Sequence, residues 1–250
     1  MKRVLVALSL SLVSLTLARP LPEIQKSGTI IFANSRDYPP FYSVENGKLV
    51  GFEIDFGNAL AKRLGLKAEW RTVGFDSLFL KLNENKIDAA VASHTITASR
   101  EKVVSFVTPH YCTGTVLVAL QGKSLEPSAM VGKVVAASQS STFAEYARKI
   151  SGVKQVLTFA TEAQAFKAMQ TGKADAYITD RLSALALAKK FPNPRVNLSS
   201  LLTEDRIAVA VKKDSTKLLS LLNSTVEAMK KDGTIDRLAV GYFSGNVACN

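Results

Sequence analysis

The chain has 250 residues, of which 47% are apolar and 21% are charged, with 32 Lys and Arg against 21 Asp and Glu. This composition excludes a disordered or low-complexity chain and leaves room for one large domain or two smaller ones. The formal net charge is +11, but no arginine-rich run and no interleaved aromatic residues accompany it. Nucleic acid is therefore not expected as a partner. We interpret the charge mainly as a solvated surface that can attract an anionic membrane or ligand.

Residues 1–18 are set apart from the rest of the sequence. Lys2 and Arg3 precede an unbroken run of Val, Leu, Ala, Ser and Thr over Val4–Leu17, and small residues suited to cleavage close the segment. Fourteen residues are too few to span a bilayer, and no cysteine follows that would make a lipoprotein. We expect a secretory signal peptide over 1–18 and an exported, soluble mature protein with 30 basic and 21 acidic residues, a net charge of +9.

The first half of the mature sequence alternates predicted strands and helices. In chain order we expect a strand over 29–33, a loop fixed by two prolines over 34–41, a helix from Gly51, a strand over 66–73, a helix from Phe75 and a buried strand over 87–92. The first helix carries an apolar stripe of Phe52, Phe56 and Leu60. Strands separated by helices pair in parallel with right-handed crossovers, which predicts an α/β sheet covered by helices.

A second set of similar elements follows. The segment 165–176 echoes the segment 78–89 at an offset of 87 residues, which suggests two similar lobes. We expect a strand over 132–137 and then a helix whose Thr142 and Glu145 form a capping box. The N-terminus of that helix would be able to receive an anion.

Two apolar segments, 113–120 and 207–211, flank the second lobe. They would carry the chain out to this lobe and back again. A later helix, with apolar residues at helical spacing from Leu218 to Met229, would then rejoin the first lobe.

The segment after the buried strand over 87–92 combines an arginine with several hydroxyl side chains. Thr97 is placed to cap a short helix, which puts Arg100 in its first turn at the carboxyl end of the sheet, where open α/β sheets bind ligands. The guanidinium can take both oxygens of a carboxylate, and Thr95 and Ser93 supply further polar partners. These residues predict a site for a small carboxylate. The alternative is a surface arginine that follows a strand.

Five short motifs occur in one order along the sequence. They are Tyr38-Pro39-Pro40-Phe41, Gly51-Phe52-Glu53-Ile54-Asp55, Thr95-Ile96-Thr97-x-x-Arg100, Phe106-x-x-Pro109-x-Tyr111 and Lys173-Ala174-Asp175-Ala176-Tyr177-x-x-Asp180. Together they resemble the polar-amino-acid family of bacterial periplasmic solute-binding proteins, the receptors of ABC importers, over about residues 28–243. The resemblance implies a type II periplasmic-binding-protein fold. In it, two Rossmann-like α/β lobes joined by a two-segment hinge close on an amino acid in the cleft between them.

The resemblance also divides the chain into parts. These are a signal peptide at 1–18, a first lobe over 19–111, a second lobe over 112–206 and a return segment to the first lobe over 207–250. A member of this family would be a periplasmic monomer that delivers its amino acid to an ABC permease in the inner membrane. It would need no metal and no cofactor.

The roles of the family's binding residues carry over to matching positions. By that resemblance Arg100 grips the α-carboxylate of the ligand, with help from Thr95 and from the backbone at Thr142. Asp180 and Ser93 then hold the α-ammonium. One structural alternative is that Asp180 only caps the helix that follows it.

An aromatic pair completes the implied site. Tyr38 and Phe75 match the family's two rings that enclose the ligand; the structural alternative is that both rings belong to the core. The expected ligand-binding set is Ser35, Tyr38, Phe75, Ser93, His94, Thr95, Arg100, Ser141, Thr142 and Asp180.

The sequence departs from the family pattern where ligand side chains are recognised. Ser35 stands where relatives that bind basic amino acids or glutamine tend to carry an acid, Phe143 replaces a polar residue, and the segment 138–140 lacks the usual glycine. A buried cationic side chain without a counter-charge would cost several kcal/mol. We therefore expect a ligand with a neutral side chain, polar rather than large and apolar. Asp37 or Glu45 could supply the missing acid if their loop folds differently.

Two other functions compete with transport. The same family contains exported cyclohexadienyl dehydratases, but Ser183 stands where those enzymes have their glutamate acid, and Phe75 where they have tryptophan. His94 and His110 lie far from any Cys or Ser motif with the logic of a catalytic triad, and no Cys/His cluster has metal spacing. We therefore expect no enzyme. A ligand-sensing module for a separate membrane receptor is the remaining alternative.

The two cysteines, Cys112 and Cys249, would meet oxidising conditions in an exported protein and can form one disulfide or remain two buried thiols. In the family the C-terminal segment returns to the first lobe near the hinge, where Cys112 would lie. On that resemblance we expect a Cys112–Cys249 disulfide.

Overall fold

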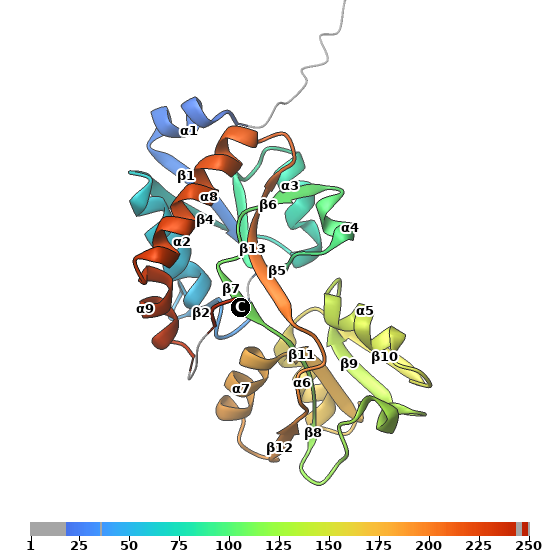
Figure 1. Ribbon diagram of the computed structural model, residues 1–250. Helices are drawn as coiled ribbons and strands as arrows, with labels where there is room; N and C mark the ends of the chain where they lie inside the picture. The colour runs from blue at the N-terminus through green and yellow to red at the C-terminus, as the bar shows by residue number, and fades with distance from the viewer. Residues whose placement is uncertain (1–18, 36, 244–246, 250) are drawn as a thin grey trace, which may run out of the picture.

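The computed structural model describes residues 19–35, 37–243 and 247–249. Figure 1 shows two lobes, one above the other, each with a sheet and covering helices, joined by extended segments. The predicted α/β fold class is confirmed, since both sheets are flanked by helices. The expected signal peptide at residues 1–18 lies outside the described residues.

The first lobe is built on a six-stranded sheet in the order β4-β1-β5-β13-β6, with β7 also paired to β13. Its strands are β1 (Thr29–Asn34), β4 (Lys67–Thr72), β5 (Ala89–Thr95), β6 (Val104–Phe106), β7 (Tyr111–Thr113) and β13 (Asp205–Lys212). Its helices are α1 (Leu21–Ser27), α2 (Phe52–Arg63), the 3-10 helix η1 (Phe75–Ser77), α3 (Leu78–Asn83), α4 (Ala98–Glu101), α8 (Thr216–Lys231) and α9 (Thr234–Val240). A small hairpin of β2 (Ser43–Glu45) and β3 (Lys48–Val50) precedes α2.

The second lobe is built on a five-stranded sheet in the order β10-β9-β11-β8-β12. Its strands are β8 (Thr115–Leu120), β9 (Val134–Ser138), β10 (Gln155–Phe159), β11 (Ala176–Asp180) and β12 (Val196–Leu198). Its helices are the 3-10 helix η2 (Pro127–Met130), α5 (Thr142–Lys149), α6 (Glu162–Gln170) and α7 (Arg181–Lys190).

The strand pairing agrees with the α/β pattern in the sequence. β1 is parallel to both β4 and β5, and β9 is parallel to both β10 and β11, as strands joined by helical crossovers should be. The returning strand β13 is antiparallel to β5. The strand predicted over 87–92 is shifted toward the C-terminus, because β5 spans Ala89–Thr95. Ser93 and Thr95 therefore belong to the end of the strand and do not follow it.

The predicted apolar stripe of α2 faces the core of the first lobe. Phe52, Phe56 and Leu60 are all fully buried. The helix begins at a close approach between two backbones, since a Cβ on Gly51 would lie 2.4 Å from the carbonyl oxygen of Phe41. Gly51 has φ +125°. Glycine is required here on both counts, which explains the start of the Gly-Phe-Glu motif.

Two segments connect the lobes. β7 pairs antiparallel with β13 in the first sheet, and after Gly114 the chain enters β8 of the second sheet. The hydroxyl of Thr115 donates to Asp205 Oδ2 at 3.1 Å, which ties the outgoing segment to the returning one. The expected lobe boundaries, at residues 111 and 206, both fall within these paired strands.

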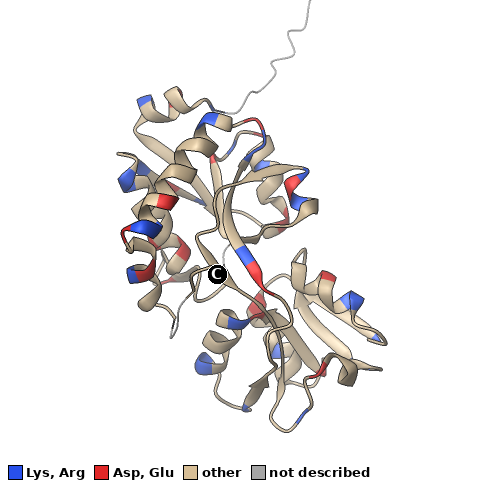
Figure 2. Ribbon diagram, viewed as in Figure 1, with Lys and Arg blue, Asp and Glu red and all other residues tan. Residues whose placement is uncertain are grey.

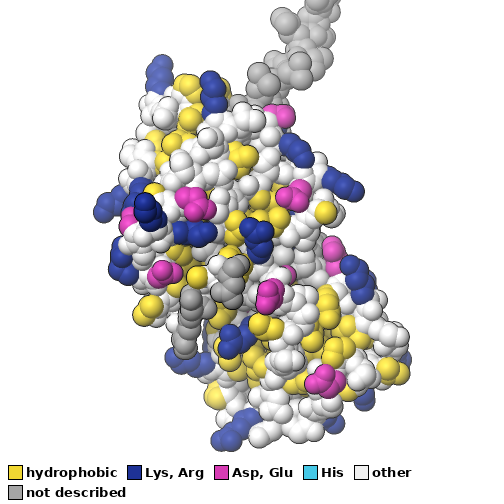
Figure 3. All heavy atoms as spheres, in the orientation of Figure 1, with side chains coloured by type: hydrophobic (Ala, Val, Ile, Leu, Met, Phe, Trp, Pro, Cys, Tyr) yellow, Lys and Arg dark blue, Asp and Glu magenta, His cyan; other side chains and the backbone are white. Residues whose placement is uncertain are grey.

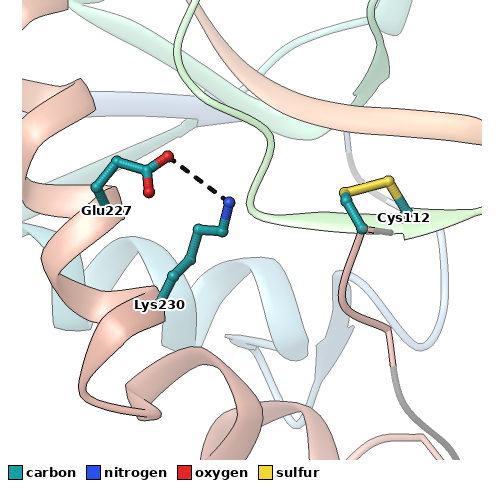
Figure 4. Close-up of a disulfide and its surroundings, with 4 residues drawn as sticks. Cys112, Glu227 and Lys230 are labelled. Carbon is teal, nitrogen blue, oxygen red and sulfur yellow. Dashed lines mark ion pairs between the residues drawn. A yellow bond between two sulfur atoms is a disulfide. The ribbon is translucent and has the colours of Figure 1, made fainter.

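The C-terminal segment returns to the strand that enters the hinge. Cys112 in β7 and Cys249 form a disulfide across a sequence separation of 137 residues, with Cα atoms 4.9 Å apart. Figure 4 shows this bond on the strand that carries Cys112. The backbone N–H of Cys112 also donates to Val247 O at 2.7 Å. The expected disulfide is therefore present, and it fastens the chain end to β7.

Charged residues are distributed over both lobes (Figure 2). In the space-filling view, acidic side chains are interspersed among the basic ones on the face shown (Figure 3). The basic excess is not gathered into one patch on that face, in keeping with a solvated surface. Within the described ranges, no helix is both long and apolar enough to cross a membrane.

Candidate functional site

A cavity of about 370 Å³ lies between the lobes. From the first lobe it is lined by Ser35, Asp37, Tyr38, Tyr42, Thr72, Val73, Gly74, Phe75, Ser93, Thr95 and Arg100. From the second lobe it is lined by Ser138, Gln139, Ser141, Thr142, Phe143, Ala160, Thr161 and Glu162. Ser and Thr are the commonest residues in the wall, and aromatic rings are added from both lobes. A cavity of this size suits a small molecule with several hydrogen-bonding groups.

The structure brings most of the expected site residues together. Eight of the ten line the cavity, and they are Ser35, Tyr38, Phe75, Ser93, Thr95, Arg100, Ser141 and Thr142. The other two, His94 and Asp180, are buried behind the wall. These eight residues come from both lobes, as expected for a site that lies between the lobes.

Arg100 is the cation of the cavity. Thr97 caps α4 by accepting the backbone N–H of Arg100 at 3.2 Å, as the sequence predicted. The Arg100 side chain donates from Nη1 to Thr95 O at 2.9 Å and lies 5.6 Å from the centre of the Phe75 ring. Burial lowers its pKa. No carboxylate of the described residues forms an ion pair with it. Its charge is therefore available to an anionic ligand.

His94 supports the aromatic wall from behind. Its ring stacks on Phe75 with centroids 4.7 Å apart and packs against Phe79 at the same distance. Burial, followed by the nearby charge of Arg100, holds the pKa of His94 well below its usual value. Burial therefore favours the neutral imidazole, and the ring packs behind Phe75 rather than lining the cavity.

Asp180 is the last residue of β11 and the N-cap of α7. Its Oδ1 accepts the backbone N–H groups of Leu182 and Ser183, at 2.7 and 3.1 Å, and so caps α7. Only 2% of the residue is exposed, and burial raises the pKa of its carboxyl to about 6. Asp180 therefore caps α7, as the structural alternative to a ligand role predicted. A ligand role for it remains a prediction.

The start of α5 differs by one residue from the predicted capping box. Ser141, not Thr142, is the cap, and its hydroxyl accepts the N–H of Ala144 at 3.1 Å. Thr142 is instead the first residue of the helix. Ser140 has φ +56°, a conformation that glycine adopts more easily. The residue therefore takes up locally the strain that a glycine in this loop would avoid.

The sequence analysis missed Glu162, which lies in the cavity wall at the start of α6. Its Oε2 accepts hydrogen bonds from Tyr177 and from Thr179, the latter at 2.7 Å. Burial raises the pKa of its carboxyl to about 7. In the sequence, an acid after a Thr cap is an ordinary helix start, so nothing marked this residue as part of a site.

The family model of bacterial extracellular solute-binding proteins, family 3, matches residues 30–245. This chain belongs to that family. The family resemblance inferred from the five motifs is thereby confirmed.

Individual relatives of this family 3 solute-binding protein bind different amino acids. The lysine/arginine/ornithine-binding periplasmic protein of Escherichia coli strain K12 is 32% identical to it, with 99% of each chain covered. The L-cystine-binding protein TcyJ of the same strain is 30% identical over 91% of this chain and 87% of its own. Among solved structures, the ancestral amino acid-binding protein AncCDT-1, a precursor of cyclohexadienyl dehydratase, superposes with a TM-score of 0.84 at 31% identity, covering 90% of this chain and 99% of its own.

The described part of this family 3 protein contains no group of three or more His, Cys, Asp or Glu side chains placed to hold a metal ion. The charged residues of the cavity wall are Arg100 and two acids, Asp37 and Glu162. The wall therefore offers partners for both anionic and cationic groups of a ligand.

Proposed function

We propose that the chain is the extracytoplasmic amino-acid-binding component of an ABC importer, holding a free L-amino acid by its two charged ends between the lobes. One observation carries the proposal: a half-buried arginine, Arg100, lines the cavity without a carboxylate partner among the described residues. A ligand carboxylate would supply that partner through two parallel charge-assisted hydrogen bonds. The names of the relatives, which bind lysine, arginine, ornithine or cystine, support the same class of ligand.

The two lobes would act as a clamp. Arg100 belongs to the first lobe, while the acids Asp180 and Glu162 belong to the second. A zwitterion that bridges them is held fully only when the lobes approach, so binding favours the closed form. The segments tied together at Thr115 and Asp205 would be the hinge of that motion.

The family and the relatives also support a location outside the cytoplasm. The proposed mature protein begins after residue 18, acts as a monomer in the periplasm, and delivers its ligand to a permease in the inner membrane. Nucleic acid has no place in this function.

The side chain of the ligand is the finer question. The expectation of a neutral side chain rested on Ser35 and on the lack of an identified acid near it. Asp37 and Glu162 both line the cavity, so acids that could pair with a cationic side chain are present. A ligand with a neutral side chain therefore stays a prediction of the sequence, and a ligand with a cationic side chain is the alternative to it.

An enzyme of the dehydratase type is not favoured by the arrangement of the site. Ser183, at the position of the family's glutamate acid, is fully buried beneath the cap of α7. Phe75 is stacked on His94 and presents only its ring to the cavity. Ser183 and Phe75 therefore offer no acid to protonate a leaving hydroxide.

Replacing Arg100 tests the proposal. The mature protein should bind at least one common L-amino acid in calorimetry, and Arg100→Ala should weaken that ligand by about thirty-fold to several-thousand-fold, the usual result of truncating one partner of a buried charge pair. Arg148→Ala, which removes an exposed arginine away from the cavity, is the matched control and should bind normally. Equal binding by Arg100→Ala and the wild type would refute the clamp.

A further inference from the structure

Glu162 is an acid that the fold holds rigidly in the wall of the cavity. It is 4% exposed, and two neighbouring hydroxyl groups of β11, from Tyr177 and Thr179, both donate to the same oxygen, Oε2. The side chain of Ser138, at the end of β9, is a further hydrogen-bonding partner of this carboxyl group. Two donors on one oxygen fix the direction of the carboxyl group, so it is preorganised to accept a further donor from the cavity.

The charges of the described residues that line the cavity do not balance one another. The described wall carries one cation, Arg100, and two acids, Asp37 and Glu162. A neutral zwitterion brings one negative and one positive group, so it leaves one acid of the wall without a partner. A ligand with a second cationic group gives each acid a partner, and for the buried Glu162 this removes the cost of an unpaired charge.

Two further acids share the surroundings of Glu162. Asp180 follows Thr179, whose hydroxyl donates to Glu162, and Asp37 lines the same cavity. Burial raises the pKa of Glu162, and the charges of both acids raise it further. Tyr38 and Tyr42 of the first lobe line this cavity too, so Glu162 and the first lobe meet the same ligand space.

Arg100 and Glu162 enter the cavity from different lobes. Arg100 lies in the first lobe beside Thr95 and Phe75, and Glu162 lies in the second lobe against Tyr177 and Thr179. The cavity therefore presents a positive group from the first lobe and a negative group from the second. A ligand with a carboxylate at one end and cationic groups toward the other matches this polarity.

We propose that Glu162 is a specificity-determining residue of the proposed amino-acid site, and that it pairs with a cationic side chain of the ligand, so that the ligand class is the basic amino acids. This inference rests on the proposed function. Asp37, from the first lobe, is the second acid that lines the same cavity.

The pH dependence of ligand binding is a second, independent test of the proposal. The pKa of the Glu162 carboxyl is raised to about 7, so part of the ligand-free protein carries a proton there near neutral pH. A cationic group placed beside Glu162 favours the ionised form, and binding then releases the proton. Affinity for a basic amino acid should therefore rise as the pH is raised from 6 to 8, and the heat of binding should depend on the ionisation enthalpy of the buffer.

The test compares L-arginine with L-citrulline, which has nearly the same shape but a neutral side chain. The wild type should bind L-arginine at least tenfold more tightly than L-citrulline at pH 8. Glu162→Gln should weaken L-arginine by at least thirtyfold and change L-citrulline by less than threefold. Glu162→Asp, which keeps the charge, should retain most of the preference. Glu227→Gln removes an exposed acid that pairs with Lys230 on α8 (Figure 4), and it should behave as the wild type.

Several outcomes would overturn the proposal. Glu162→Gln could weaken both ligands equally, which would make Glu162 a partner of the α-ammonium or a purely structural acid. Glu162→Gln could also leave the affinity for both ligands unchanged, which would mean that Glu162 has no role in binding. A wild type that prefers neutral amino acids, or whose preference for L-arginine does not grow with pH, overturns this inference alone even if the variants fail to fold. A wild type that binds no amino acid overturns the proposed function and this inference with it.

Discussion

Ser93 donates both its backbone N–H and its hydroxyl to one oxygen of the Glu53 carboxylate, at 2.8 and 3.0 Å. Ser93 lines the cavity and has φ +54°, an uncommon conformation for a residue other than glycine. The other oxygen of Glu53 lies 3.0 Å from Nε2 of His110, just before the hinge strand β7. One fully buried carboxylate therefore joins the start of α2, the cavity wall and the entry to the hinge.

Replacing Glu53 by Gln should weaken both the fold and the site. The amide cannot accept from Ser93 and His110 with the strength of a carboxylate, and hydrogen bonds to charged groups contribute about 1.5 to 3 kcal/mol each. We expect a loss of about 2 to 3 kcal/mol in the free energy of unfolding, measured by urea denaturation, together with weaker ligand binding. Glu45→Gln, at an exposed position in β2, is the control. A Glu53→Gln variant as stable as the wild type would contradict this account.

The elements of this fold were predictable because they depend on local patterns. Alternating strands and an apolar helix stripe gave the parallel pairs and α2, and the Thr97 cap placed Arg100 correctly. The cap of α5 was misplaced because Ser141 and Thr142 are adjacent hydroxyl residues and either can cap a helix. Only the packing of the loop, with Ser140 at positive φ, selects the first of them.

The rest of the site depends on contacts between segments distant in sequence. Glu162 lies in the cavity wall because Tyr177 and Thr179 of β11 hold its carboxyl group. Without such partners, a glutamate in the first turn of a helix is usually exposed to solvent. His94 was expected among the ligand-binding residues, together with its neighbours Ser93 and Thr95. Neighbouring residues of a strand point to opposite faces, and its ring lies between Phe75 and Phe79 instead.

Asp180→Asn should separate the two roles of this residue. Asparagine caps helices about as well as aspartate, so the free energy of unfolding should change by less than about 1 kcal/mol. If Asp180 also provides the counter-charge of the ligand ammonium, the variant should bind the α-amino acid at least about tenfold more weakly, a loss of 1.4 kcal/mol or more. A carboxylate analogue without the amine should bind as it does to the wild type. Calorimetry with both ligands decides this, and equal weakening of both would assign Asp180 to the fold alone.

The ligand-free protein should lose stability at these two acids as the pH rises. Burial raises the pKa of Glu162 to about 7 and that of Asp180 to about 6, both well above the ordinary values of 4.5 and 3.8. A carboxyl whose pKa is higher in the folded state holds more protons when folded, so its stabilisation is present below about pH 4 and lost as the pH rises toward 7. Each proton changes the free energy of unfolding by up to about 1.4 kcal/mol per pH unit.

Other carboxylates change the pH dependence in the opposite direction, so the measurement is a difference. Melting temperatures of the wild type and Glu162→Gln, recorded without ligand from pH 5 to 8, should diverge, with the wild type losing more. Parallel curves would show that the environment of Glu162 does not oppose its ionisation.

Reducing the disulfide should destabilise the protein without removing the site. Cys112 and Cys249 close a loop of 137 residues, for which the chain-entropy model gives about 5 kcal/mol, a figure that strain in the folded state often reduces. We expect Cys112→Ser/Cys249→Ser to melt at a lower temperature and still to bind ligand, since neither residue lines the cavity. The wild type in reductant should behave like the double variant. Unchanged melting in both cases would mean that the bond adds nothing to stability.

Gly114 should be the least replaceable residue of the hinge. A Cβ at this position would lie 2.2 Å from the carbonyl oxygen of Thr203 and 2.9 Å from Cδ2 of Leu201. The oxygen belongs to the backbone of the returning segment, where the Thr203 hydroxyl lies 2.7 Å from that of Thr115. Gly114→Ala must therefore push the two segments apart, and overpacking of this kind costs about 1 to 3 kcal/mol. We expect a lower melting temperature and, because the segments set the path of lobe closure, weaker ligand binding. Gly241→Ala is the matched control, since its nearest contact is 3.4 Å and its φ of −69° suits alanine. If Gly114→Ala melts and binds like Gly241→Ala, the close approach of the two segments does not control the hinge.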